Sequence, residues 1–159
     1  FALVQEVREF FDGTILLAGS LGSGRSILGA QAIGADLAYI GPRLVATEEA
    51  NADPRYTEMI VASAADAVRC SSPFTGVPGN YLKPPLPNAG LDPEDLPDGK
   101  KANMNFGSGG NTKAKAWKDI WGCGQGIGVV DAVRPAANIV DQLADEYHAA
   151  AKALDAKRY

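Results

Sequence analysis

Two glycine-containing segments whose backbone could hold an anion follow two short apolar runs near the start of the chain. Residues 19–24 read Gly-Ser-Leu-Gly-Ser-Gly, and Gly41-Pro42-Arg43 follows the second run. Glycine lets backbone N–H groups approach a ligand without obstruction by a side chain, and Arg43 adds a cation. The pair of segments predicts that one phosphate group is held between them. Each segment alone fits a tight turn equally well.

The elements that would position these segments form a βαβ unit. Strands are predicted at Ile15-Leu16-Leu17-Ala18 and at Leu37-Ala38-Tyr39-Ile40, and a helix is predicted at 23–33 between them. Runs that are apolar throughout are typical of parallel strands covered on both faces. In parallel α/β folds, ligands bind at the carboxyl ends of the strands, which is where both glycine segments would lie.

The order of the motifs resembles that of the flavin-dependent nitronate monooxygenase family. That family typically reads Ala-Gly-Gly-Ile after one strand, then Met-Gly-Thr-Arg-Phe and Ala-Thr-Glu-Glu after the next. The corresponding residues here are Ala18-Gly19-Ser20-Leu21, Ile40-Gly41-Pro42-Arg43-Leu44 and Ala46-Thr47-Glu48-Glu49. Residues 74–78 (Phe-Thr-Gly-Val-Pro) and 121–128 (Trp-Gly-Cys-Gly-Gln-Gly-Ile-Gly) also match, so the resemblance covers most of the chain.

The resemblance implies an α/β fold, a (β/α)₈ TIM barrel with FMN at the carboxyl face of its strands. The residues that would hold the FMN phosphate are Ala18, Gly19, Ser20, Ile40, Gly41, Pro42 and Arg43. Gln125 and Gly126 would lie on the substrate or flavin side. Two residues depart from the family pattern. Ser20 replaces a glycine, and Pro42 replaces Thr or Ser, which removes one N–H donor and one hydroxyl.

The length of 159 residues is too short for a complete TIM barrel, which needs roughly 250. We therefore interpret the chain as a single partial barrel domain, the C-terminal part of a larger barrel. Residues 1–71 would be the last βα units with the phosphate-binding loops, 72–112 an irregular insertion rich in Pro and Gly, and 113–159 a Gly-rich loop and the closing helix. The expected partner is the remainder of the barrel, either a missing N-terminal part or another chain.

Hydrophobic spacing and caps predict the other elements. Helices are expected at 6–11, 53–65 and 131–157, helical turns at 114–120, and a short strand outside the barrel at 67–71. In the last helix, Glu146 is assigned to the solvent-exposed face. The apolar stripe of that helix is predicted to consist of Ile139, Val140, Leu143, Tyr147, Ala151 and Leu154.

Composition argues against several classes of function. A net charge of −4 is unlike that of a nucleic-acid binder, and no apolar run approaches the roughly 18 residues of a membrane helix. Cys70 and Cys123 form no CxxC pattern, so we predict free, buried thiols and a cytoplasmic location. His148 is the only histidine and has no ligand-like neighbours, so no metal site is predicted.

The resemblance implies an FMN-dependent oxidoreductase that acts on a small molecule, oxidising alkyl nitronates with O₂ to a carbonyl compound and nitrite. Two alternatives stay open: an NAD(P)H:quinone reductase or enoyl-thioester reductase on the same barrel, and a half-barrel that serves only as a structural partner. The family's catalytic histidine would lie in the missing N-terminal region, so no catalytic base is assigned. A homodimer is also compatible with the resemblance.

Overall fold

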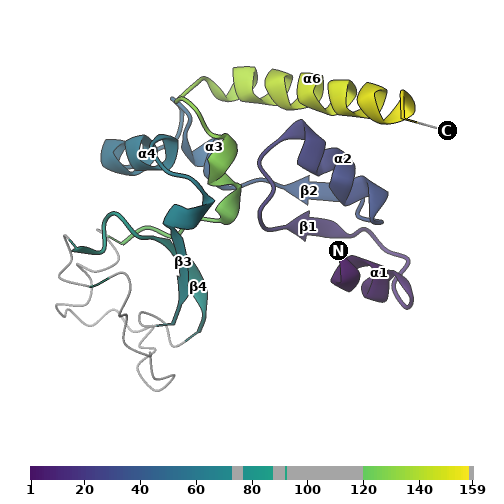
Figure 1. Ribbon diagram of the computed structural model, residues 1–159, viewed down its shortest axis with the longest axis horizontal. Coiled ribbons are helices and arrows are strands. Elements are labelled where there is room, and N and C mark those ends of the chain that lie inside the picture. Colours follow the sequence, from purple (N-terminus) through teal and green to yellow (C-terminus); the bar gives the residue numbers. More distant parts are fainter. Residues whose placement is uncertain (73–76, 88–91, 93–119, 158–159) are drawn as a thin grey trace.

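The computed structural model describes residues 1–72, 77–87, 92 and 120–157, and Figure 1 shows their arrangement. Its N-terminal part is a βαβ unit made of strand β1 (Leu16–Ala18), helix α2 (Gly24–Ala32) and strand β2 (Leu37–Tyr39). The strands are parallel, and Leu16 pairs with Leu37 while Ala18 pairs with Tyr39. The predicted strand–helix–strand order is confirmed, with boundaries that agree to within a residue.

The first helix differs from the prediction. Helix α1 spans Ala2–Arg8 rather than 6–11, and Phe10 and Phe11 lie beyond its end with exposed side chains. The buried anchor is Val4, which packs with Ala30 and other residues around α2. Arg8 at the end of α1 donates to the carbonyls of Gly34 and Gly13 and to the Asp36 carboxylate, so long-range contacts set where this helix ends.

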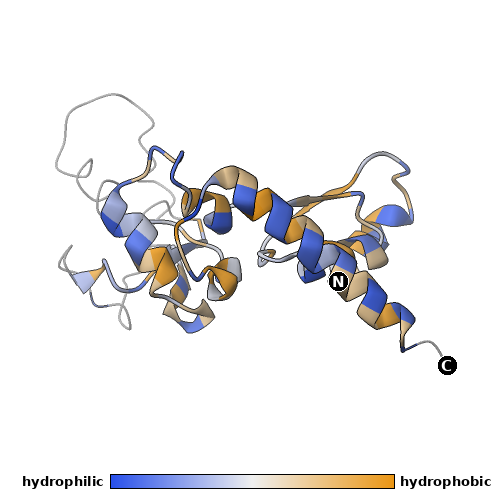
Figure 2. Ribbon diagram, turned by 90° about the horizontal axis from the view of Figure 1, so that it is seen from above, coloured by the Kyte–Doolittle hydropathy of each residue, from blue (hydrophilic) through white to orange (hydrophobic). Residues whose placement is uncertain are grey.

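The last helix, α6 (Ala136–Asp155), lies alongside α2 and covers it (Figure 1). Figure 2 shows hydrophilic and hydrophobic residues alternating along α6. The predicted apolar stripe is partly wrong, because Val140 and Leu154 are exposed. The side that packs against the rest of the chain includes Ile139, Leu143 and Ala150. The same side carries Gln142, Glu146 and Tyr147, which are partly buried.

A second group of elements follows β2. Helix α3 (Pro42–Val45) leads to α4 (Pro54–Val61), whose predicted Asp53 cap is confirmed by a bond from the N–H of Arg55. After the 3₁₀ turn η1 (Ala65–Ala67), strand β3 (Val68–Ser71) pairs antiparallel with β4 (Gly79–Leu82). The 3₁₀ turn η4 (Gln125–Val129) packs beside α3 and η1. The buried core of this part comprises Ala46, Ile60, Leu82, Cys123, Ile127 and Val130.

Strand β4 corrects the prediction that 72–112 is irregular throughout. Tyr81 and Leu82 are buried, and their burial against β3 stabilises a strand that the surrounding Pro and Gly residues conceal in the sequence. The other residues of that insertion, 73–76, 88–91 and 93–112, lie outside the described residues, as does the predicted helical segment before Ile120.

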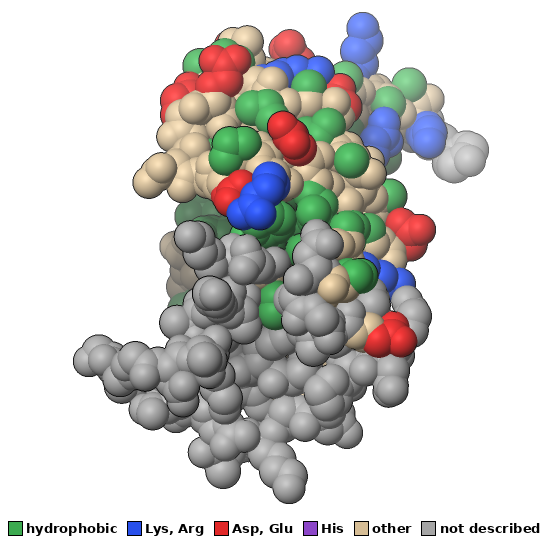
Figure 3. All heavy atoms as spheres, turned by 90° about the vertical axis from the view of Figure 1, so that its left-hand side faces the viewer, with side chains coloured by type: hydrophobic (Ala, Val, Ile, Leu, Met, Phe, Trp, Pro, Cys, Tyr) green, Lys and Arg blue, Asp and Glu red, His purple; other side chains and the backbone are tan. Residues whose placement is uncertain are grey.

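One face of the β1–β2 pair is open. Leu16, Leu37 and Tyr39 are 52%, 54% and 62% exposed, whereas Leu17 and Ala38 on the opposite face are half-buried beneath α2. The expectation of strands covered on both faces is therefore met on only one face. On the side of the molecule where α4 lies, Figure 3 shows hydrophobic side chains interspersed with acidic and basic ones.

Candidate functional site

The loop after β1 has an unusual backbone conformation. Gly19 has a φ of +103°, and the next residue, Ser20, has a φ of +55°, the only positive value at a non-glycine among the described residues. Residues with a Cβ rarely adopt this left-handed region, because the Cβ crowds the following carbonyl. A glycine at this position would adopt the same conformation without this crowding.

Some backbone N–H groups in this loop donate to a protein acceptor, and others remain available. The hydroxyl of Ser26 accepts from the N–H groups of Gly22 and Ser23, and the Ser23 hydroxyl accepts from the N–H of Ser26. This capping box satisfies the start of α2. Within the described part of the chain, the N–H groups of Ser20 and Leu21 donate to no protein acceptor. They are available to a ligand at the carboxyl end of β1.

The second loop offers donors at the carboxyl end of β2. Gly41 precedes α3, and an added Cβ there would have no atom within 4 Å. Among the described residues, the N–H groups of Gly41 and Arg43 also donate to no protein acceptor. Pro42 occupies the first helical position, where a helix has no internal partner for an N–H. Since β1 and β2 are neighbouring parallel strands, both sets of donors lie at the same edge of the sheet.

The Arg43 side chain lies elsewhere than expected. It is 3% exposed, and its guanidinium donates to the carbonyl of Gly22 at 2.6 Å and to the carboxylate of Glu146 at 3.1 and 3.3 Å. This cation is therefore paired inside the protein. Only its backbone N–H remains to contribute to the predicted anion site.

Glu146 is the residue of this region that the sequence interpretation missed, because it was assigned to the solvent-exposed face of α6. Its carboxylate also accepts from the N–H of Gly24 at 2.8 Å and from the Gln142 amide at 3.0 Å. Partial burial alone would raise the pKa of Glu146, but the hydrogen bonds from Arg43 and Gly24 outweigh this and lower it. Its position seven residues after the buried Ile139 was the signal in the sequence, because that spacing puts both on one helical face.

The glycine-rich segment around η4 packs against the first loop. The Ser20 hydroxyl lies 3.4 Å from the Gln125 side-chain oxygen. A Cβ on Gly126 would lie 2.8 Å from the Leu21 carbonyl oxygen, and one on Gly22 would lie 2.4 Å from the Gly126 carbonyl oxygen. The structure thus brings Gln125, which is 105 residues away in sequence, and the adjacent Gly126 beside the loop that contains Ser20.

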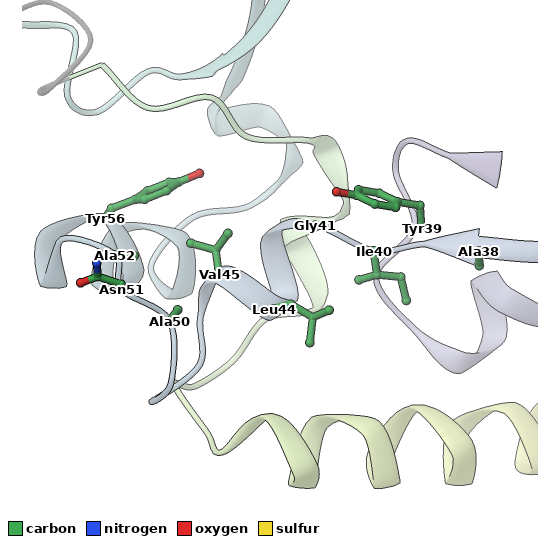
Figure 4. A pocket seen from close by; sticks show the side chains of 10 residues that line it. All are labelled: Ala38, Tyr39, Ile40, Gly41, Leu44, Val45, Ala50, Asn51, Ala52 and Tyr56. Atoms are coloured by element: carbon green, nitrogen blue, oxygen red, sulfur yellow. The ribbon is translucent and has the colours of Figure 1, made fainter. Parts of the chain in front are cut away.

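A pocket of about 790 Å³ adjoins Gly41. Its walls are mainly apolar, and the rings of Tyr39 and Tyr56 face one another across it (Figure 4). The Tyr56 hydroxyl donates to the Gly122 carbonyl, and its ring stacks on Trp121 at 5.1 Å. Burial, together with the nearby Cys123 sulfur, raises the pKa of Tyr56 to about 12, so the phenol stays protonated at neutral pH.

The two cysteines are free, as predicted, but only Cys123 is buried, whereas Cys70 is exposed on β3. Burial raises the pKa of Cys123 to about 11, which keeps it a thiol at neutral pH. Among the described residues, no cluster of His, Cys, Asp and Glu could hold a metal ion, and His148 is exposed. No described helix has both the length and the apolar character needed to cross a membrane.

Comparison with known proteins places these features in a family. The family model described as nitronate monooxygenase matches residues 1–146. The chain is 30% identical over 164 residues to the protein Rv1533 of Mycobacterium tuberculosis and 25% identical over 169 residues to a nitronate monooxygenase of Neurospora crassa. Each alignment covers 91% of this chain but only 42% of the relative, so the chain spans less than half the length of these proteins.

Solved structures share the fold. A nitroalkane oxidase from Streptomyces ansochromogenes superposes with a TM-score of 0.73 and 27% identity, over 96% of this chain and 44% of that one. FabK from Thermotoga maritima superposes with a TM-score of 0.70 and 20% identity, over 98% of this chain and 51% of that one. The second likeness concerns the fold alone. With the family model matching most of its length, this chain belongs to the nitronate monooxygenase family.

Proposed function

We propose that this chain is the C-terminal, phosphate-binding part of an FMN-dependent TIM-barrel enzyme that oxidises alkyl nitronates with O₂ to a carbonyl compound and nitrite. The observation that carries the proposal is a set of N–H donors at the ends of two adjacent parallel strands. Among the described residues these donors have no protein acceptor, and the chain belongs to the nitronate monooxygenase family. Backbone N–H groups arranged in this way bind phosphate groups in many α/β proteins.

The residues fit this cofactor. The N–H groups of Ser20, Leu21, Gly41 and Arg43 would hold the phosphate, and the open space at Gly41 leaves room for it. Gln125 lies beside Ser20 and would face the flavin or the substrate. When bound, the flavin supplies the electron acceptance that the oxidation needs. The protein holds the group in place and orients it.

The pocket beside Gly41 suits the apolar part of the substrate. Ala38, Ile40, Leu44 and Val45 line it with hydrocarbon, and Tyr39 projects into it (Figure 4). A nitronate is an anion with an alkyl group, and its alkyl group would lie against these walls.

The open face of β1 and β2 supports the partial barrel. Leu16, Leu37 and Tyr39 form an apolar surface that a soluble monomer rarely leaves uncovered. We propose that the remainder of the barrel covers it, and that the assembled enzyme is cytoplasmic and can form a homodimer.

The experiment that tests the function starts with the absorbance of the purified protein between 350 and 500 nm. Two flavin bands, released on heating and identified as FMN by mass, are expected. Nitrite production from an alkyl nitronate should then require O₂. A protein that cannot be reconstituted with FMN would refute the proposal, and anaerobic bleaching by NADH would favour the reductase alternative.

A variant of Gly41 separates binding from folding. Gly41→Val adds a side chain into space that contains no protein atom within 4 Å of the Cβ, at an ordinary φ of −98°. The variant should keep the thermal stability of the parent and lose affinity for FMN. The matched control is Gly29→Val, which also has no atom within 4 Å of an added Cβ and lies in the interior of α2 rather than at the end of a strand.

A further inference from the structure

One carboxylate on α6 connects the two loops of the proposed phosphate site. An oxygen of Glu146 accepts from the N–H of Gly24, at the start of α2, and both of its oxygens accept from the Arg43 guanidinium. Arg43 in turn donates to the carbonyl of Gly22 in the loop after β1. Since Arg43 itself follows β2, this small network joins the loop after one strand to the loop after the other.

The geometry of the pair limits how these loops can move. The Arg43 side chain is 3% exposed and that of Glu146 is 30% exposed, so the cation lies almost entirely out of water. A guanidinium is planar and places its N–H groups in a fixed fork, so it binds a carboxylate and a carbonyl in only a narrow range of orientations. Removing one partner of a buried ion pair leaves an uncompensated charge, which the surrounding structure must move to accommodate.

We infer that Glu146 and Arg43 are positioning residues that fix the distance between the two glycine loops, so that their N–H groups converge on one phosphate. This inference rests on the proposed function. The pair would not touch the phosphate through its side chains, because the Arg43 charge is already neutralised by Glu146. The N–H groups of Ser20 and Leu21 belong to the loop after β1, and those of Gly41 and Arg43 follow β2.

The test compares FMN with riboflavin, which has the same ring system but no phosphate. Dissociation constants for both are measured by quenching of flavin fluorescence on the apoprotein of the parent, of Glu146→Gln and of Arg43→Lys. Glu146→Gln keeps the size of the side chain and removes its charge. Arg43→Lys keeps the charge and removes the fork. Asp145→Asn is the control, because it makes the same charge change at the neighbouring, exposed position of α6.

We expect the preference for FMN over riboflavin to fall about tenfold or more in Glu146→Gln and in Arg43→Lys, since a charge-assisted hydrogen bond accounts for that much. Riboflavin affinity should change little, and Asp145→Asn should keep the preference of the parent. Thermal unfolding of each apoprotein is measured beside the titrations, so that an unfolded variant is recognised.

The outcomes separate this inference from the proposed function. A parent protein with no preference for FMN would overturn the function and the inference together. A parent that prefers FMN, with variants that keep that preference, would overturn the inference alone. Equal loss of both flavins in both variants would show that the pair only maintains the fold, and would also overturn it.

Discussion

At Gly24 the backbones of α2 and α6 lie close together, and replacing Gly24 by alanine should be strongly destabilising. A Cβ there would lie 2.2 Å from the carbonyl oxygen of Leu143 and 2.2 Å from the backbone nitrogen of Tyr147. Ordinary contacts are about 3.5 Å. Because both neighbours are backbone atoms, no side chain can rotate away, and the helices must separate by on the order of 1 Å.

The cost follows from two contributions. Overpacking costs about 1–3 kcal/mol, and the hydrogen bond from the Gly24 N–H to the Glu146 carboxylate, which the separation would break, contributes about 1.5–3 kcal/mol. The higher helix propensity of alanine returns about 1 kcal/mol. Gly24→Ala should therefore lower the free energy of unfolding by about 1.5–5 kcal/mol.

The same substitution in the same helix provides the control. Gly29 has no atom within 4 Å of an added Cβ, so Gly29→Ala should raise the free energy of unfolding by about 0.5–1 kcal/mol through helix propensity. Urea unfolding at equilibrium, followed by circular dichroism, measures both variants. If the free energy of unfolding of Gly24→Ala is within about 1 kcal/mol of that of the parent, the close approach of the helices is not rigid and the reasoning fails.

Three further outcomes are expected. Ser20→Gly should raise the free energy of unfolding by about 0.5–1 kcal/mol, because it relieves the left-handed backbone at φ +55°, and an unchanged urea midpoint would contradict this. The pKa of Glu146 in the folded chain lies below its ordinary value of 4.5. The contribution of this carboxylate to the free energy of unfolding is therefore complete above pH 4.5 and is lost as the pH falls through the lowered pKa of the folded state. Unfolding measured from pH 6 to pH 3 should therefore be less acid-sensitive in Glu146→Gln, and equal acid sensitivity would refute the pairing. Iodoacetamide at neutral pH should label the exposed Cys70 well before the buried Cys123, whose pKa is about 11. Mass spectrometry of the digest measures the order of labelling, and labelling of Cys123 first would contradict this prediction.

The part of the fold that the sequence predicts is the part set by local pattern. Apolar runs that end in glycine, with an Ala-rich stretch between them, predict the ends of β1, α2 and β2 to within one residue. The Asp53-Pro54 start of α4 is equally local, since a capping carboxylate and a proline with fixed φ act on their own turn. The short spacing of these signals is why no tertiary information was needed.

The features that the sequence did not predict depend on contacts between distant segments. Strand β4 exists because Tyr81 and Leu82 are buried against β3, and nothing in the surrounding Pro-rich sequence indicates that partner. Glu146 was assigned to solvent because a carboxylate beside an apolar stripe usually faces water. Its partner, Arg43, lies 103 residues earlier, and only the packing of α6 on α2 brings the two together.

The location of Arg43 changes how the proposed phosphate site must work. With its guanidinium paired to Glu146, the site has no free cation from this residue, so its attraction for an anion comes from backbone N–H groups. Such a site depends on geometry more than on charge, because each donor contributes only when it points at the phosphate. Pro42 removes one N–H and one hydroxyl relative to the family pattern. Four other N–H groups nearby, those of Ser20, Leu21, Gly41 and Arg43, have no protein acceptor within the part of the chain that the structure describes. The loss of these two donors would therefore weaken phosphate binding without abolishing it, provided that the loops after the two strands keep their relative positions.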